Sequence, residues 1–163
     1  MQANKNDVAN SKRKLWVNVA KILVLALIVL GVNRLVQSYL GSSAYDNTGL
    51  GDLTLSEAID TAKSSNRLVL ADMSAIWCPS CRKLDNQVLS QPDVKDVINQ
   101  SYVFTRIEYD SEEGEAFMQQ FDVSGFPTLL VLNAEGDKLV QLPLTFDPNK
   151  FKSLLQQATE RFK

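Results

Sequence analysis

The sequence predicts an α/β fold in which a four-stranded mixed sheet carries helices on both faces, preceded by one transmembrane helix. Three patterns predict it: strand-like apolar runs alternate with helical patterns, the last two runs flank a hairpin-type turn, and a long apolar stretch lies near the amino terminus. The chain has 163 residues, of which 45% are apolar and 22% charged, and this composition is typical of one globular domain.

Apolar periodicity and breaker residues place each element along the chain. The expected helices cover residues 55–64, 79 to about 89, 92 to about 99, 112–121 and a stretch from 148 onward, and the expected strands cover 67–73, 102–109, 128–132 and 138–142. Strands separated by helices favour parallel pairing, whereas the Asn-Ala-Glu-Gly-Asp turn between the last two strands favours an antiparallel hairpin.

The amino-terminal stretch predicts a membrane anchor. Residues 15–38 are mostly apolar, and a helix over residues 15–36 would extend about 33 Å, enough to cross a bilayer. The basic cluster just before it keeps residues 1–14 in the cytoplasm by the positive-inside rule and exports the remainder of the chain. A flexible linker is expected over residues 39–52, because this stretch is rich in Gly, Ser, Asp and Asn, and the folded domain over residues 53–163.

Two other interpretations of the apolar stretch stay open. A secretory signal peptide could be cleaved after Ser42-Ser43-Ala44, or the stretch could be a buried helix of a soluble domain. With an uncleaved anchor, the protein is a single-pass protein of the cytoplasmic (inner) membrane, with its carboxy-terminal domain in the periplasm or the extracellular space.

Composition excludes several kinds of chemistry. The sequence contains no histidine, which rules out His-ligated zinc and Ser-His-Asp or Cys-His catalysis. Acidic residues outnumber basic ones after the apolar stretch, so nucleic acid is not an expected partner. We therefore expect neither a metal nor an organic cofactor, and the remaining reactive groups are the two cysteines.

Cys78 and Cys81 form a Cys-x-x-Cys pair between a predicted buried strand and the start of a helix. Free N–H groups at a helix start stabilise a thiolate, so Cys78 is expected to be an exposed, acidic nucleophile. Cys81, about one turn later, could then attack a mixed disulfide at Cys78. The alternatives are a metal site shared by two chains, an inert structural disulfide, and two unrelated core cysteines.

Asp72 interrupts the apolar run of the first strand. A buried carboxylate at this position would have a raised pKa and could accept the proton of Cys81. Alternatively, Asp72 marks the end of the strand and forms a hydrogen bond to a turn.

Asp72, the Trp77-Cys78-Pro79-Ser80-Cys81 segment and the Gly125-Phe126-Pro127-Thr128 segment together resemble the thioredoxin superfamily over about residues 53–163. The stretch from Leu68 through Val94 is similar to the carboxy-terminal thioredoxin-like domain of DsbD-type transmembrane thiol reductases.

This resemblance implies a thioredoxin-like fold and a role for several further residues. Pro127 would be a cis-proline beside the cysteines, and Trp77, Phe126 and Pro127 would bind an extended substrate segment. Pro79 and Ser80 would tune the cysteine pair. Arg106 falls where relatives place a lysine near the buried acid and would tune Asp72, unless it is an exposed strand residue. The family's usual glycine near the last helix has no counterpart within residues 143–146.

The expected function is a membrane-anchored thiol-disulfide oxidoreductase that reduces protein disulfides outside the cytoplasm. In this hypothesis Cys78 attacks, Cys81 resolves and Asp72 moves the proton. The partners would be protein disulfide clients and a separate membrane electron donor, such as a DsbD-type transmembrane reductase, because the anchor contains no cysteine. The alternatives are a disulfide oxidase or isomerase, and a non-catalytic accessory or assembly subunit of a membrane complex.

Overall fold

The computed structural model describes the backbone of residues 5–51 and 53–162, and the side chains from residue 13 onward within those ranges. Residues 1–4, which open the predicted cytoplasmic tail, and residue 52 of the predicted linker lie outside the described residues. The chain divides into two compact units, Met1–Val36 and Gln37–Lys163.

The first unit consists of helix α1 (Lys5–Asp46), whose last turns belong to the second unit. In the part of the chain that the structure describes, one helix, Arg13–Asp46, is long and apolar enough to cross a membrane. Its large apolar side chains are exposed; Leu30, for example, is 64% exposed. The apolar stretch is therefore helical, as predicted.

The predicted flexible linker is wrong for residues 39–46, because α1 continues through them to Asp46. Gly41 and Ala44 are buried in the second unit, so tertiary packing holds a helix that its composition would not favour. After α1 the chain turns at Thr48, whose hydroxyl donates to the Tyr45 carbonyl at 2.7 Å and accepts from the Leu50 N–H at 3.2 Å.

The second unit is built on a four-stranded sheet in the order β2-β1-β3-β4. Its strands are β1 (Leu68–Ser74), β2 (Tyr102–Glu108), β3 (Thr128–Leu132) and β4 (Lys138–Gln141). β1 pairs with β2 in parallel and with β3 antiparallel, and β3 and β4 form the predicted hairpin. Every residue of β1 is buried, which identifies β1 as the central strand and confirms the predicted mixed sheet.

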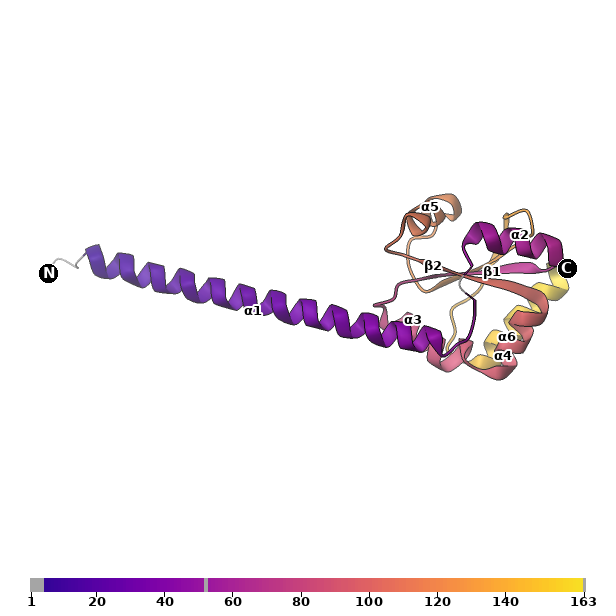
Figure 1. Cartoon of the computed structure of the whole chain (residues 1–163), viewed down its shortest axis with the longest axis horizontal. Coiled ribbons are helices and arrows are strands. Elements are labelled where there is room, and N and C mark those ends of the chain that lie inside the picture. Colours follow the sequence, from indigo (N-terminus) through magenta and orange to yellow (C-terminus); the bar gives the residue numbers. More distant parts are fainter. Residues whose placement is uncertain (1–4, 52, 163) are drawn as a thin grey trace. The chain divides into compact units, whose positions relative to one another are not determined.

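Helices cover both faces of this sheet, as Figure 1 shows for the second unit. They are α2 (Leu55–Ser65) and α5 (Glu112–Phe121) on one face, and α4 (Pro92–Ser101) and α6 (Pro148–Phe162) on the other. The N-cap of α2 is Thr54, which forms a capping box with Glu57.

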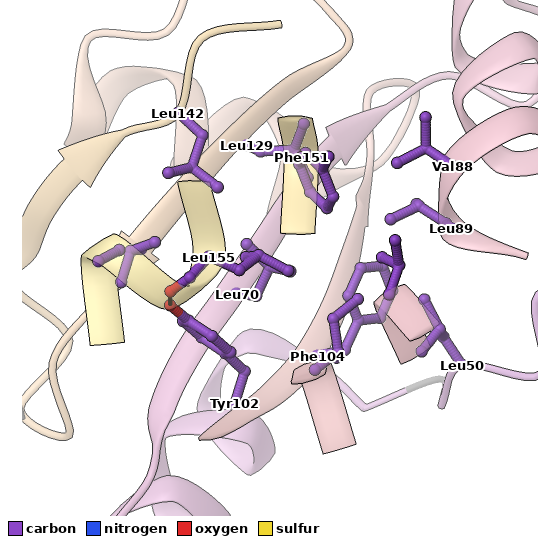
Figure 2. Close-up of a cluster of buried hydrophobic side chains, with 14 of the residues drawn as sticks. Leu50, Leu70, Val88, Leu89, Tyr102, Phe104, Leu129, Leu142, Phe151 and Leu155 are labelled. Carbon is purple, nitrogen blue, oxygen red and sulfur yellow. Dashed lines mark hydrogen bonds between the residues drawn. The ribbon is translucent and has the colours of Figure 1, made fainter. Parts of the chain in front are cut away.

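The larger core lies between the sheet and the α4–α6 face. Figure 2 shows Leu70, Phe104 and Leu129 of the sheet close to Phe151 and Leu155 of α6. The Tyr102 hydroxyl in this core donates to the Leu155 carbonyl at 2.6 Å. Leu50, which comes after α1 in the chain, joins the same cluster, so residues after the predicted anchor contribute to the domain core.

The helix that comes after β1 differs in detail from the expected single helix to residue 89. It consists of α3 (Pro79–Leu84) followed by the π-helical turn η1 (Asp85–Leu89). Side-chain periodicity over five residues cannot distinguish a π turn from an α turn, because the two differ by less than one residue per turn. The wider turn includes Asp85, which is buried.

Candidate redox site

The site begins where β1 ends and the chain turns into α3. The Cys78 N–H donates to the Ala75 carbonyl at 2.9 Å, which closes the turn. Cys78 is the N-cap residue of α3, and Pro79 occupies the first turn, where its missing N–H costs no hydrogen bond. The N–H of Cys81 donates to the Cys78 sulfur at 3.1 Å. The helix start therefore directs a backbone donor at Cys78 Sγ, as the sequence predicts.

Cys78 and Cys81 form a disulfide, which confirms that the two cysteines lie together. The prediction that Cys78 is exposed is wrong in this oxidised state, since Cys78 is 3% exposed and Cys81 2%. Both pack with Ala75 against the aromatic rings of Trp77, Tyr109 and Phe126. The Ser80 hydroxyl lies 3.6 Å from Cys78 Sγ, so Ser80 is close enough to influence that sulfur.

Three aromatic rings pack against the cluster that holds the disulfide. The Trp77 ring packs edge-on against Phe126 at 5.4 Å between centroids, and Phe126 lies 4.8 Å from Tyr109. The Trp77 indole N–H donates to Asp110 Oδ2 at 2.7 Å, which fixes the ring orientation. The Phe126–Pro127 peptide bond is cis, as the resemblance implied. Trp77, Phe126 and Tyr109 thus form an apolar surface beside the disulfide, and Tyr109 was not predicted from the sequence.

Asp72 lies inside β1 and is fully buried, so the alternative that it ends the strand is wrong. Its partner in the register of β2 is Arg106, whose Nη2 and Nε donate to Asp72 Oδ2 at 2.6 and 3.1 Å. The Arg106 side chain is only 9% exposed, so it is not an exposed strand arginine. Asp72 Oδ1 has no hydrogen-bond partner among the described residues.

Arg106 is shared with a second carboxylate that sequence reasoning missed. Its Nη1 and Nη2 donate to the two oxygens of Asp85 at 3.0 and 2.5 Å. The face of its guanidinium is covered by the ring of Tyr45, whose centroid lies 4.0 Å from Arg106 Cζ. In the sequence, Asp85 lies between the apolar residues Leu84 and Val88, and this was the available signal that its side chain could point inward.

One guanidinium therefore faces two buried carboxylates. Burial raises the pKa of Asp72, Arg106 opposes that rise, and the negative charge of Asp85 adds to it. Burial alone would lower the pKa of Arg106, but Asp72 and Asp85 outweigh it and raise this pKa above its ordinary value. Arg106 therefore stays cationic, and Asp72 is the group in this cluster poised to take up a proton.

Glu108, at the end of β2, holds the loop that leads to Cys78. Both of its carboxylate oxygens accept the Ile76 N–H at 3.1 Å. Burial raises the pKa of Glu108, while the hydrogen bond from Ile76 lowers it. The neighbouring Tyr109 N–H donates to the Ser74 carbonyl at 2.7 Å. Glu108 was also missed, because its role depends on strand register rather than on a local motif.

Among the residues that the structure describes, no group of three or more Cys, Asp or Glu side chains is arranged to hold a metal ion. The Cys78–Cys81 pair is a group that can undergo thiol–disulfide exchange.

Comparison with known proteins agrees with this geometry. A family model described as a thioredoxin-like domain matches residues 55–159, more than half of the chain. This chain therefore belongs to the family of thioredoxin-like domains, and its disulfide lies at the Cys-x-x-Cys pair.

Particular relatives are thiol:disulfide interchange proteins. DsbD of Salmonella typhi is 23% identical over 139 residues, which cover 82% of this chain and 24% of that protein. DsbD 2 of Pseudomonas aeruginosa is 30% identical over 111 residues, which cover 66% of this chain and 19% of that protein. The chain thus spans about a quarter or less of the length of these relatives, so it corresponds to a part of them.

Solved structures support the same fold. A thioredoxin from Thermus thermophilus superposes with a TM-score of 0.61 at 25% identity, covering 67% of this chain and 86% of that one. The oxidised carboxy-terminal domain of Neisseria meningitidis DsbD superposes with a TM-score of 0.55 at 24% identity, covering 66% of this chain and 97% of that one. The thioredoxin-like part of the chain is homologous to the carboxy-terminal domain of DsbD.

Proposed function

We propose that this protein is a membrane-anchored thiol-disulfide oxidoreductase that reduces protein disulfides outside the cytoplasm. The observation that carries the proposal is the Cys78–Cys81 disulfide at a helix start, close in the chain to the buried Asp72. Asp72 lies on β1, and the turn that ends at Cys78 comes directly after this strand.

The proposed cycle starts from the reduced dithiol. The Cys78 thiolate attacks one sulfur of a client disulfide, which forms a mixed disulfide and releases the other client sulfur as a thiolate. Asp72 accepts the proton of the Cys81 thiol, and the Cys81 thiolate then attacks Cys78 Sγ. The second client thiolate leaves and takes up a proton. Two electrons pass to the client, and the Cys78–Cys81 disulfide is left.

The cycle requires a source of electrons outside the chain. We propose a membrane electron donor with a reactive dithiol, such as a DsbD-type transmembrane reductase, which reduces the disulfide by the reverse exchange. The apolar helix Arg13–Asp46 would hold the domain at the same membrane. The basic cluster at residues 12–14 favours a cytoplasmic amino terminus, which would put the redox domain in the periplasm or the extracellular space.

The apolar surface beside the disulfide is proposed to receive the client. Trp77 and Phe126 offer ring faces and edges to apolar side chains, and the backbone at Phe126–Pro127 would pair with an extended segment. The client is therefore expected to be an unfolded or extended stretch of protein around a disulfide.

The test of direction is the equilibrium of the full chain with glutathione redox buffers. A reductant is expected to have a potential roughly between −200 and −270 mV, in the range of glutaredoxins and thioredoxin. A potential of about −120 mV, like that of a strong oxidant, would contradict the reductase proposal and favour the oxidase alternative.

A docking role without turnover is tested by thiol reactivity. If the reduced protein catalyses insulin reduction and Cys78 alkylates faster than a free cysteine peptide at about pH 7, the enzyme proposal holds. If neither is observed, the accessory or assembly subunit is the better interpretation. The Cys78→Ser variant is the control, because it removes the nucleophile, and its fold is checked by thermal unfolding.

A further inference from the structure

The amino-terminal part of the second unit packs against the redox centre. This docked segment comprises residues 37–50, the last turns of α1 and the turn after it. Gly41, Ala44 and Thr48 on one side of it are buried, and Leu50 lies in the main hydrophobic core. The docked segment is therefore part of the folded domain.

Gly41 is the point of closest approach. A Cβ atom at this position would overlap the carbonyl oxygen of Ile76, so only glycine allows the helix to lie here. The N–H of the same Ile76 is held by Glu108. The backbone of Ile76, two residues before Cys78, is thus held on one side by β2 and on the other by the docked segment.

Two further contacts reach the same centre. The Gln37 side-chain carbonyl accepts from Arg82 Nη1 at 2.5 Å, and Arg82 is the residue directly after Cys81 in the chain. The Tyr45 ring covers the guanidinium of Arg106, and the Tyr45 hydroxyl donates to the Gly51 carbonyl at 2.9 Å, which fixes the ring. The docked segment therefore touches the residues on both sides of the cysteine pair and the cation that pairs with Asp72.

We propose that the docked segment is a fixed wall of the redox centre, in which Gly41 positions the loop that carries Cys78 and Tyr45 positions Arg106 on Asp72. This inference rests on the proposed function and deepens it, because it assigns positioning residues to the same exchange chemistry. It also means that residues after the membrane anchor set the reactivity of the cysteine pair.

The first experiment compares Gly41→Ala with Gly31→Ala in the full chain in detergent micelles. Gly31 lies in the same helix and has open space where a Cβ would be added, so it is the matched control. Hydrogen exchange of the amides of residues 76–78 is measured in the oxidised protein. Gly41→Ala is expected to speed this exchange by about tenfold or more, because the loop loses one of its two supports, and Gly31→Ala to leave it unchanged.

The second experiment removes the Tyr45 ring. Tyr45→Ala is compared with Tyr45→Phe, which keeps the ring, and with Tyr39→Ala, since Tyr39 is 75% exposed in the same helix. The measurement is the pH dependence of oxidation of the reduced protein by glutathione disulfide. The charged groups that act on Asp72 are Arg106 on β2 and Asp85 on η1, and Glu108 on β2 interacts in turn with Arg106.

Tyr45→Ala is expected to move the limb of that profile due to Asp72 to higher pH by about half a unit or more, because a guanidinium that the ring no longer holds against Asp72 opposes the rise of its pKa less. Tyr39→Ala is expected to match the wild type, and Tyr45→Phe, which keeps the ring over Arg106 and loses only the hydrogen bond to Gly51, to shift less than Tyr45→Ala. A change of this kind in a variant with unaltered thermal unfolding separates positioning from loss of fold.

The proposal is overturned if Gly41→Ala exchanges like Gly31→Ala, or if folded Tyr45→Ala keeps the wild-type profile or shifts to lower pH. Should Gly41→Ala not fold, Gln37→Ala supplies the first arm, with faster exchange of residues 76–78 expected. A failure of the proposed function gives a different result, because the wild type itself would then react with glutathione disulfide no faster than a small dithiol such as dithiothreitol. Hydrogen exchange of residues 76–78 would still show whether the docked segment holds the loop.

Discussion

At the scale of single residues, the buried cluster around Arg106 determines the direction in which the pKa of Asp72 is shifted. Asp72 is fully buried, and Arg106 forms ion pairs with two carboxylates, those of Asp72 and Asp85. Burial of two charged carboxylates beside one guanidinium is costly unless one of them can take a proton. The carboxyl oxygen of Asp72 that lacks a partner among the described residues is the atom on which a proton can reside.

The raised pKa of Asp72 predicts how stability depends on pH. Since the folded-state pKa lies above the ordinary value of 3.8, the native state binds this proton more tightly, and stability is lost as pH rises through the folded pKa. Asp72→Asn is therefore expected to raise the free energy of unfolding at about pH 8 by about 1–3 kcal/mol, with the gain shrinking toward about pH 4. Urea unfolding across this pH range measures it.

The control for that measurement is Asp93→Asn, whose side chain is 75% exposed in a surface ion pair with Lys152. It is expected to change stability by less than about 1 kcal/mol at either pH. If Asp72→Asn were destabilising at the higher pH, the assignment of a strained buried charge to Asp72 would be incorrect.

The same substitution is expected to slow exchange. Without its carboxylate, the Cys81 thiol loses its base, so release of the client from the mixed disulfide should slow by roughly 100-fold, at the lower end of general-base effects. Single-turnover kinetics separate this step from the attack by Cys78, which should change little. An equal slowing of both steps would contradict a role confined to Cys81.

Replacement of Arg106 has the opposite effect on stability. Arg106→Leu leaves Asp72 and Asp85 buried without their cation and is expected to cost about 3–5 kcal/mol in the free energy of unfolding at about pH 7. Lys152→Leu, which breaks the exposed pair with Asp93, is the matched control and should cost less than about 1 kcal/mol. Chemical unfolding of both variants checks the difference, and similar costs would mean that the buried cluster contributes no more than a surface pair.

At the scale of elements, the loop between β1 and α3 is held by the end of β2. Glu108→Ala is expected to free the Ile76 N–H, to speed amide exchange in residues 75–78 and to lower stability by about 1–2 kcal/mol, because a half-buried donor loses its acceptor. Glu108→Gln keeps an acceptor oxygen and should lie close to the wild type. If the amides of residues 75–78 exchanged equally fast in Glu108→Ala and Glu108→Gln, the acceptor oxygen at residue 108 would not be what holds this loop.

Sequence patterns were sufficient for the order and type of the elements in the second unit. Apolar periodicity located every strand, and Pro79, Pro92 and Pro148 marked the starts of three helices. Local patterns failed where distant residues decide the structure. Residues 39–46 are rich in Gly and Ser but are helical because they pack on the domain, and the π turn at η1 has no local signature.

The same distinction applies to the site. The positions of Cys78, Cys81 and Asp72 could be predicted from short stretches of sequence. Two cysteines at a strand–helix junction are unusual, and so is an acidic residue inside an apolar strand. Asp85, Glu108 and Tyr45 were missed. Each contacts the site only through strand register, a helix turn or tertiary packing, so no spacing along the chain identifies it.

At the scale of the whole molecule, the last turns of the apolar helix belong to the docked segment, and the thioredoxin-like domain follows along the chain. Residues 37–50 therefore join the proposed membrane attachment to the redox chemistry. The composition also supports the proposed external electron donor: the domain can hold two electrons in its cysteine pair, and this sequence contains no other cysteine to deliver them.

The most direct test of thiol-disulfide exchange is a trapping measurement with the reduced full chain and a protein disulfide such as insulin. The Cys81→Ser variant is expected to accumulate a mixed disulfide through Cys78 that is stable without added reductant, whereas the wild type releases reduced insulin and becomes oxidised. Absence of an adduct with Cys81→Ser, in a folded protein whose wild-type form also leaves insulin oxidised, would contradict exchange at this cysteine pair.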